Sequence, residues 1–369
     1  MSARPIAGRA LRLGLCLAAA GLALAVMTAP LRLGPEDLRA AYAGPPETWP
    51  LPEIDPGVDY VELAPRALPS RPVPGSPAAA RRALGQALFV DPALSASGQI
   101  ACESCHNPRL GWGDGLPRSK GHDRQEGPRN APALHVAGAG LPLFWDGRAD
   151  TLEAQALGPL GNPLEMANAD LGAIAPRLAG RAEYAPMFRA AFGSQEVTLE
   201  RIVAALAEFQ KYLDRPTRLD RFLSGDRRAL SDLELRGLHL FRTRARCANC
   251  HFGPLLSDGQ FHDLGLSYLG RRFEDLGRYA VTGLPGDAGR FRTPSLRHVS
   301  DTGPYMHNGL FPHLPGLIRL YAIGGGRSAR LPADPDAVET GAATASPLLR
   351  RLDLDESDVE ALAAFLGAV

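Results

Sequence analysis

Two short stretches of the chain follow one pattern, Cys102-Glu-Ser-Cys-His106 and Cys247-Ala-Asn-Cys-His251. Each reads C-x-x-C-H, the attachment signature of c-type haem, in which both thiols form thioethers to the porphyrin and the histidine ligates the iron. We call these two stretches the first and the second haem word. On a helical turn, residues i and i+3 project from one face with the next residue beside them. The sequence therefore predicts two covalent haem c groups, held by the thiols of Cys102, Cys105, Cys247 and Cys250, with His106 and His251 as proximal iron ligands.

Two other uses of paired cysteines compete with haem attachment. A zinc ribbon wants its C-x-x-C pairs close together in sequence, whereas Cys105 and Cys247 lie in different halves of the chain. Zinc would also not require a histidine directly after each pair. A thiol redox motif calls for a βαβ context, which neither flank supplies. Both alternatives are weaker than covalent haem.

The composition bounds the class of protein. The chain has 369 residues, of which 45% are hydrophobic, so two domains with sizeable cores and a targeting segment can be built from it. Lys and Arg total 40, as do Asp and Glu, and the formal net charge is zero. A nucleic-acid partner would call for a basic domain or stripe, so we expect none.

The first 29 residues have the form of an export signal. Arginines near the start precede an uncharged run from Leu13 to Ala29, which fits a signal peptide and also reaches the lower length limit of a membrane span. Residues 1–29 are therefore either a cleaved signal peptide or a retained membrane anchor. Bacterial c-type haem is attached outside the cytoplasm, so we expect a periplasmic protein, soluble or tethered by this segment.

Prolines and haem words divide the rest of the chain. Twelve prolines fall between Pro30 and Pro77, so we expect an extended Pro-rich linker over residues 30–75. Residues 76–225 would form the N-terminal haem c domain. Residues 226–369 would form the C-terminal one.

Helical signals flank both haem words. Ser76-Pro77 pairs an N-cap residue with proline at the first helical position, and Ser231-Asp-Leu-Glu234 is a capping box. We expect further helices from near Asp150, over residues 199–213 and from Ser357 to the C-terminus. Strand-like alternation is scarce, so the predicted fold is mainly α, with two c-type cytochrome-like haem domains and long loops.

Several blocks of sequence outside the haem words resemble the bacterial dihaem cytochrome c peroxidases and MauG, the methylamine-utilisation protein. The resemblance runs from about Ser76 to the C-terminus, with the blocks in matching order and spacing. These blocks are Gly127-Pro-Arg-Asn-Ala-Pro132, Phe144-Trp-Asp-Gly-Arg148, Gln155-Ala-Leu-Gly-Pro159, Leu164-Glu-Met166 and Pro304-Tyr-Met-His-Asn-Gly309.

The resemblance implies different roles for the two haems. The N-terminal haem would be the peroxide site, and the C-terminal haem would receive electrons from an external donor. Trp145 matches the tryptophan between the haems, where it relays electrons or simply packs as a core aromatic. Glu165 and Gln155 match the catalytic polar residues over the peroxide-binding face, where a positioned carboxylate can move the proton that O–O cleavage requires.

The resemblance also suggests metal ligands. His122 matches a distal histidine that caps the peroxide-site iron in the resting peroxidases, although loop histidines are commonly only solvated. Tyr321 stands where the peroxidases have a methionine ligand to the second iron and MauG has tyrosine. It either ligates iron as a hard phenolate or packs nearby in protonated form. One calcium ion would bind between the domains at Asn130, Thr302 and Pro304.

Three functions follow from these expectations. The first is an enzyme, a cytochrome-c peroxidase that reduces hydrogen peroxide to water with electrons from a small cytochrome c or cupredoxin. The second is a MauG-like enzyme that oxidises a protein substrate through a high-valent bis-haem state, which Tyr321 favours. The third is a dihaem electron carrier, against which Glu165 and Gln155 argue, because a carrier needs no proton shuttle.

Overall fold

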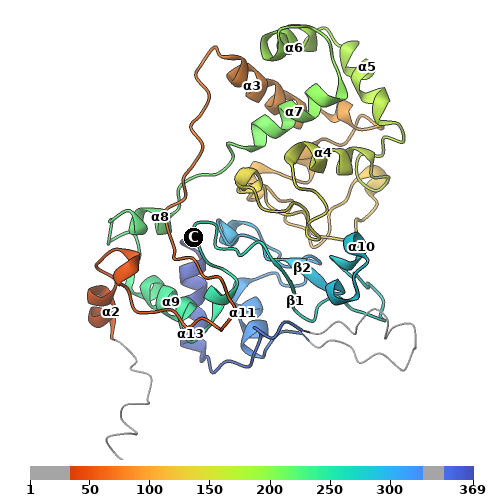
Figure 1. Cartoon of the computed structure of the whole chain (residues 1–369). Coiled ribbons are helices and arrows are strands. Elements are labelled where there is room, and N and C mark those ends of the chain that lie inside the picture. Colours follow the sequence, from red (N-terminus) through yellow and green to blue (C-terminus); the bar gives the residue numbers. More distant parts are fainter. Residues whose placement is uncertain (1–33, 327–344) are drawn as a thin grey trace, which may run out of the picture.

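The computed structural model describes residues 34–326 and 345–369, and these form a mainly α protein of two lobes (Figure 1). The expected export signal, residues 1–29, lies outside the described residues. Within the described part, no helix is both long and apolar enough to cross a membrane. The helices are α2 (Pro35–Ala41), α3 (Pro77–Phe89), α4 (Leu152–Gly161), α5 (Ile174–Ala179), α6 (Tyr184–Phe192), α7 (Leu199–Gln210), α8 (Arg218–Leu223), α9 (Asp232–Arg242), α10 (Tyr279–Thr282), α11 (Leu314–Ala322) and α13 (Glu356–Leu366).

The first lobe contains α3 to α7, and the second contains α8 to α13 (Figure 1). The first lobe is built around the crossing of α3 and α7. Ser76 caps α3 as expected, since its hydroxyl accepts a hydrogen bond of 3.2 Å from the backbone N–H of Ala79. Gly85 lies at the crossing, where an added Cβ would stand 1.9 Å from the carbonyl oxygen of Ala205 on α7. Only a residue without a side chain lets the two helices approach this closely. The first haem word follows α3 after a 3₁₀ turn at Pro92–Leu94 and a loop.

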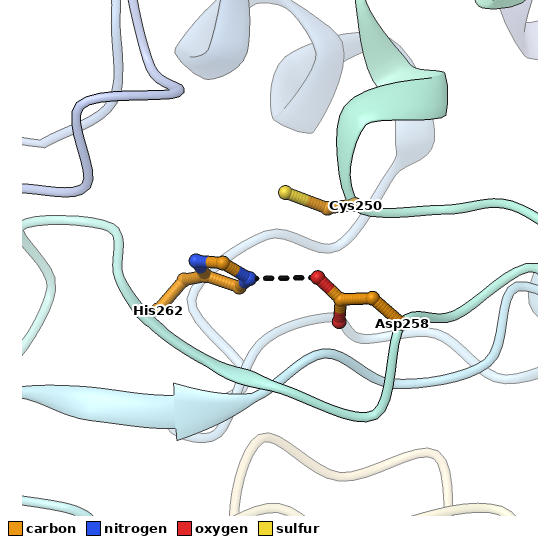
Figure 2. Close-up of side chains that lie close together, drawn as sticks. All are labelled: Cys250, Asp258 and His262. Atoms are coloured by element: carbon orange, nitrogen blue, oxygen red, sulfur yellow. Dashed lines mark hydrogen bonds and ion pairs between the residues drawn. The ribbon is translucent and has the colours of Figure 1, made fainter. Parts of the chain in front are cut away.

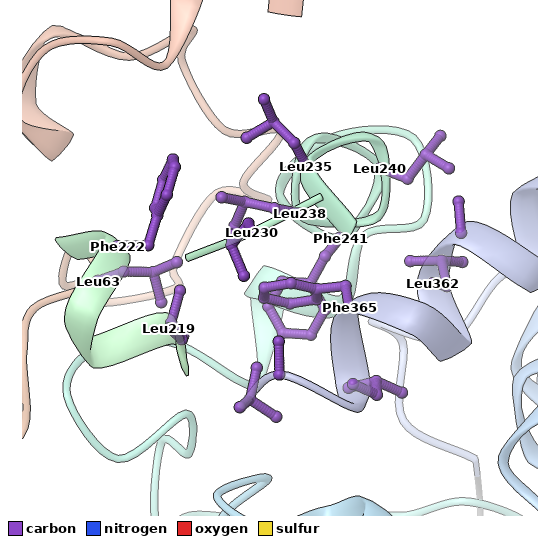
Figure 3. Packing of buried hydrophobic residues seen from close by; sticks show 14 of the residues in the cluster. Leu63, Leu219, Phe222, Leu230, Leu235, Leu238, Leu240, Phe241, Leu362 and Phe365 are labelled. Carbon is purple, nitrogen blue, oxygen red and sulfur yellow. The ribbon is translucent and has the colours of Figure 1, made fainter. Parts of the chain in front are cut away.

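The second lobe repeats this arrangement with α9 and α13. Ser231 and Glu234 form the expected capping box at the start of α9. A Cβ at Gly237 would stand 2.0 Å from the carbonyl oxygen of Ala361, so α9 and α13 also cross at a glycine. The apolar faces of these helices, including Phe241 and Phe365, form the core of this lobe (Figure 3).

Local caps set two of the expected helix starts. The helix expected near Asp150 is capped by Thr151 and begins at Leu152. The last helix begins at Glu356 rather than Ser357, because Asp355 accepts a hydrogen bond from the backbone N–H of Asp358 and a capping box forms two residues earlier.

The Pro-rich segment is largely extended, but part of it packs on the second lobe instead of standing free. Residues 35–64, which we call the strap, insert Tyr42, Trp49 and Leu63 into the same core as Phe222 (Figure 3 shows Leu63 and Phe222). The Tyr42 and Trp49 ring centroids are 4.9 Å apart, and Trp49 lies 5.8 Å from Phe222. The strap and α3 are therefore joined by a short stretch of chain that runs between the lobes (Figure 1).

The strap also reaches the second haem word. The side-chain amide of Asn249, inside C-A-N-C-H, donates a 2.9 Å hydrogen bond to the carbonyl of Glu53. Its Oδ1 accepts a 2.7 Å bond from the backbone N–H of Asp55. Further along, the backbone N–H of Gly253 donates to the carbonyl of Val61 at 3.0 Å. The strap therefore fixes the loop that carries the second haem word.

Charged and backbone contacts join the two lobes. Arg129 of the first lobe makes a two-pronged ion pair with Asp275 of the second, with nitrogen–oxygen distances of 2.6 and 2.8 Å. A short antiparallel ribbon of β1 (Phe261–Asp263) and β2 (Arg290–Arg292) lies at the same boundary. At its end, the backbone N–H of Arg292 donates to the carbonyl of Trp145 at 2.8 Å.

Candidate functional site

The first haem word folds as a tight turn that points His106 inward. A 3₁₀ turn spans Cys102–Ser104, and His106 follows it. The Nδ1–H of His106 donates to the carbonyl oxygen of Trp112 at 3.1 Å, which leaves Nε2 to serve as an iron ligand. Burial lowers the pKa of His106, so its imidazole is neutral, as metal ligation requires.

The second haem word repeats this geometry. A 3₁₀ turn spans Cys247–Asn249, and Nδ1–H of His251 donates to the carbonyl of Leu256 at 2.9 Å. Burial again lowers the pKa of the imidazole. The accepting residues, Trp112 and Leu256, both have positive φ angles, 62° and 51°. Two chain segments far apart in the sequence therefore present an imidazole in the same way.

The four thiols are free and neutral. Burial raises the pKa of Cys105 to about 11 and that of Cys102, Cys247 and Cys250 to about 12. Thiol redox motifs need the opposite shift, toward a stable thiolate, so this chemistry is disfavoured. Three of the thiols line cavities, while Cys102 packs against the apolar core of the first lobe. Paired thiols beside a neutral, oriented imidazole form a donor set that fits covalent haem.

The first cavity, of about 1040 Å³, brings together most residues expected at the peroxide site. It lies between the first haem word, α4 and the loop that follows α4. Cys105 and His106 line it, and so do Gln155, Glu165 and Trp145. A proton-carrying carboxylate therefore shares a cavity with a candidate iron ligand.

A hydrogen bond positions the Glu165 side chain in this cavity, and its surroundings change the pKa of its carboxyl group. Its Oε1 accepts a 2.6 Å hydrogen bond from the side-chain amide of Asn162. Burial raises the pKa of Glu165, while Asn162 and the positive charge of Arg148 act in the opposite direction. A carboxyl group whose pKa lies above its ordinary range is suited to accepting and returning a proton near neutral pH.

His122 lies beside this cavity without lining it. Its backbone N–H donates to the carbonyl of Glu165 at 2.9 Å, so the loop is anchored next to the catalytic candidate. The ring Nε2, however, is 3.4 Å from Oδ2 of the neighbouring Asp123, and Nδ1 is buried without a partner in the described part of the chain. The role of His122 as a distal ligand stays a prediction.

Tyr321 lies in the second cavity with the second haem word. Cys247, Cys250, His251 and Tyr321 all line this cavity, whose remaining walls are mainly apolar. Burial raises the pKa of the Tyr321 phenol, and the nearby thiols of Cys250 and Cys247 raise it further. A phenol in this setting stays protonated unless a cation stabilises the phenolate. The position fits a ligand to a haem iron held by His251.

Trp145 lines both cavities and therefore forms part of the wall between them. Its Nε1–H donates to the carbonyl of Asn130 at 2.9 Å, which fixes the ring. Asn130, Thr302 and Pro304, the calcium candidates, all line the second cavity. The side-chain amide of Asn130 donates to the carbonyl of Leu116 at 2.9 Å. Calcium binding at these three residues stays a prediction.

The sequence did not single out three polar residues of the cavity walls. Arg292 and His307 line both cavities, and His307 stacks on Phe291 with ring centroids 3.7 Å apart. His135 lines the second cavity, is 5% exposed and has no hydrogen-bond partner on either ring nitrogen within the described residues. His307 belongs to a recognised block, whereas nothing local marks Arg292 or His135.

One further group of metal-capable side chains lies at the edge of the second cavity. Cys250, Asp258 and His262 bring one ligand atom each within 4.8 Å of the others (Figure 2). Nε2 of His262 is 2.8 Å from Oδ2 of Asp258. Thioether formation would remove the Cys250 thiol from this group, leaving an Asp–His pair beside the porphyrin. The group is therefore more consistent with part of a haem pocket than with a separate metal site.

The chain is similar to known dihaem proteins. A family model described as di-haem cytochrome c peroxidase matches residues 79–228. The methylamine utilization protein MauG of Methylorubrum extorquens is 42% identical over 247 residues, 66% of this chain and 69% of that protein. The cytochrome c551 peroxidase of Nitrosomonas europaea is 41% identical over 229 residues, 61% of this chain and 68% of that protein. The crystal structure of a MauG-like protein associated with microbial copper homeostasis matches with a TM-score of 0.70 and 31% identity, over 84% of this chain and 93% of that one.

Proposed function

The chain belongs to the family of di-haem cytochrome c peroxidases and MauG proteins, and from this premise we propose that it reduces hydrogen peroxide to water with electrons from a small redox protein. The observation that carries the proposal is the shared cavity of His106, Glu165 and Gln155. The reaction converts one hydrogen peroxide, two electrons and two protons into two waters.

In this proposal the chain holds two haem c groups through its C-x-x-C-H words. Bound haem supplies the iron centres that exchange electrons with peroxide and with the external donor. Nε2 of His106 and Nε2 of His251 would be the atoms that hold the iron, because Nδ1 of each ring is already bonded to a backbone carbonyl. This bond also fixes each ring's orientation and makes it a better electron donor to the metal.

Glu165 transfers the proton at the peroxide site. Cleavage of the O–O bond to give water requires that a proton move from one peroxide oxygen to the other. The Oε2 atom of Glu165 accepts and returns that proton, while Asn162 holds Oε1 in place. Gln155 faces the same cavity from α4 and orients peroxide by hydrogen bonding.

Trp145 connects the two halves of the reaction. Electrons enter singly at the second lobe from a small cytochrome c or cupredoxin and pass to the first through the wall that contains Trp145. The Nε1–H of Trp145 donates to the Asn130 carbonyl, which is not basic enough to take the proton. The indole can therefore lose and regain an electron without losing that proton. We place the protein in the periplasm and include a calcium ion at Asn130, Thr302 and Pro304 as part of this proposal.

The second candidate is a MauG-like oxidation of a protein substrate, and Tyr321 favours it. A phenolate is a hard ligand that stabilises the ferric or higher oxidation state, unlike the methionine of the peroxidases. The second lobe would then store oxidising equivalents as well as deliver electrons. Tyr321→Phe separates ligation from packing, because it should change the absorption spectrum of the second haem while leaving the first unchanged.

One experiment separates the two candidates. The fully ferric and the half-reduced protein are each mixed with hydrogen peroxide, and the spectra of both haems are recorded over time. A peroxidase of the methionine type reacts only after one haem is reduced, whereas a MauG-like protein reacts in the ferric state with changes at both haems. Slow reaction in both states would reject both and leave a dihaem electron carrier.

A further inference from the structure

Among the described residues, Arg292 differs from the other arginines of the second cavity in having no carboxylate partner. Arg297 forms a bidentate ion pair with Asp220, with distances of 2.7 and 2.8 Å. Two more arginines of this cavity, Arg246 and Arg350, share the carboxylate of Asp55 on the strap. Within residues 34–326 and 345–369, no acidic side chain forms an ion pair with Arg292.

The first cavity repeats this contrast. Its other three arginines are paired with carboxylates, and Arg292 again is not. The pairs are Arg118 with Glu126, Arg129 with Asp275 and Asp146, and Arg148 with Asp146. Arg292 is therefore the arginine common to both cavities and the one whose charge stays uncompensated within the described chain.

The surroundings of Arg292 hold its side chain in the dividing wall. Its backbone N–H bonds the carbonyl of Trp145 at 2.8 Å, and Nη1 donates to the carbonyl of Thr293 at 3.2 Å. Burial lowers its pKa to about 10, so the guanidinium is still charged at neutral pH. A desolvated charge without a counter-charge is costly, and only weak contacts to carbonyls offset that cost here.

We propose that Arg292 is a positioning residue that binds the propionate carboxylates of the porphyrins at the wall containing Trp145. This inference rests on the proposed occupancy of both cavities by haem. Each porphyrin carries two propionates, and a planar guanidinium binds carboxylates in a two-pronged geometry. Because Arg292 faces both cavities, one positive charge fixes porphyrin edges on both sides of the wall and offsets their negative charge.

The consequence for redox chemistry has a defined sign. A positive charge close to a haem favours the reduced state, which carries one positive charge less at the iron. Loss of the Arg292 charge should therefore stabilise ferric haem. We expect Arg292→Gln to lower the reduction equilibrium constant of at least one haem about tenfold, or about 59 mV for a one-electron couple.

The test uses the full-length holoprotein and three variants. Midpoint potentials are measured by spectroelectrochemistry for the wild type, Arg292→Gln, Arg292→Lys and Arg350→Gln, after haem content is checked by the alkaline pyridine assay. Arg292→Lys keeps the charge and should stay within about threefold of the wild-type equilibrium constant. Arg350→Gln is the matched control, because its side chain lines the second cavity but is 51% exposed, so that solvent screens its charge.

The outcomes distinguish this inference from the proposed function. A wild type with fewer than two haems per chain would reject the function itself. Two haems with equal potentials in the wild type and Arg292→Gln, or equal shifts in Arg292→Gln and Arg350→Gln, would overturn only the role of Arg292. If Arg292→Gln fails to take up haem, resonance Raman bands of the propionates in Arg292→Lys decide. Unchanged bands would overturn the proposal, because replacing the two-pronged donor must alter a real contact.

Discussion

The indole Nε1–H of Trp145 donates a 2.9 Å hydrogen bond to the carbonyl of Asn130, and both residues line the two cavities at once. One bond thus fixes the ring that separates the candidate peroxide site from the candidate electron-entry site. The predictions below follow from this wall and from the packing that supports it.

Trp145→Phe should slow electron transfer between the haems while leaving both attached. Phenylalanine keeps an aromatic ring but loses the N–H, so the Asn130 carbonyl is left without its donor, at a cost of about 1–2 kcal/mol in the free energy of unfolding. Stopped-flow spectroscopy of the half-reduced protein mixed with peroxide measures the transfer. Trp112→Phe is the control, since Trp112 packs on Phe89 and Phe209 in the first lobe. Equal rates in the two variants would exclude a relay at Trp145.

Glu165→Gln should lower the second-order rate constant for peroxide by about 10²- to 10⁴-fold, the usual contribution of a positioned acid–base group. Burial raises the pKa of Glu165, so the wild-type rate should fall as pH decreases through a value above the ordinary glutamate range, because the base must be ionised. The variant should lack this limb of the pH profile. Glu153→Gln, on the same α4 helix region but outside both cavities, should retain it. A limb that persists in Glu165→Gln would assign the proton to another group.

His135 should make the protein less stable in mild acid. Burial, His298 and Arg215 lower its pKa to about 4, although Asp214 and Asp301 act in the opposite direction. The unfolded chain, with a pKa near 6.5, therefore binds the proton more readily, and stability decreases as pH falls from 6.5 toward 4. This group alone accounts for about 2 kcal/mol at pH 5 relative to pH 7.

Urea unfolding at pH 7 and pH 5 measures that contribution. His135→Gln should lose most of the pH-dependent difference, whereas His313→Gln, at an exposed position, should keep it. If His135→Gln and the wild type lose equal stability on acidification, the buried imidazole is not its source.

Gly85→Ala and Gly237→Ala should each destabilise one lobe. The new Cβ would stand 1.9 or 2.0 Å from a backbone carbonyl oxygen of the crossing helix, so the helices must separate, at a cost of about 1–3 kcal/mol. Thermal unfolding followed by circular dichroism measures the loss. Gly286→Ala is the control, because a Cβ there meets nothing within 4 Å. An unchanged melting temperature in both crossing variants would mean that the helices lie farther apart than described here.

Local signals in the sequence predicted local structure well. The caps at Ser76 and Ser231 form as expected, since each depends on residues within one helical turn. The expected helix start at Ser357 was wrong for an equally local reason, because Asp355 and Asp358 form a capping box that starts the helix at Glu356. The mainly α fold is confirmed on the same basis, because helix periodicity and capping signals dominate the chain.

The sequence did not predict contacts between segments that are far apart in the chain. The strap was expected to be a free linker, since prolines exclude a helix but do not reveal that Tyr42 and Trp49 complete a core formed by residues much later in the chain. Arg292 is one arginine among many until the structure sets it beside Trp145 and pairs the other cavity arginines with acids. The haem words and family blocks marked the residues of the site, but the residues of its walls are defined by folding.

Because of the strap, the second lobe contains residues that are synthesised before the first lobe as well as residues synthesised after it. Ribosomal synthesis makes residues 35–64 before the first lobe, yet their binding partners, among them Asn249 and Arg242, are made after it. The second lobe can therefore be completed only when this segment, synthesised before the first lobe, packs against residues synthesised after it. Shortening the chain from its N-terminus should therefore weaken the lobe that is farthest away in sequence, and leave its nearer neighbour intact.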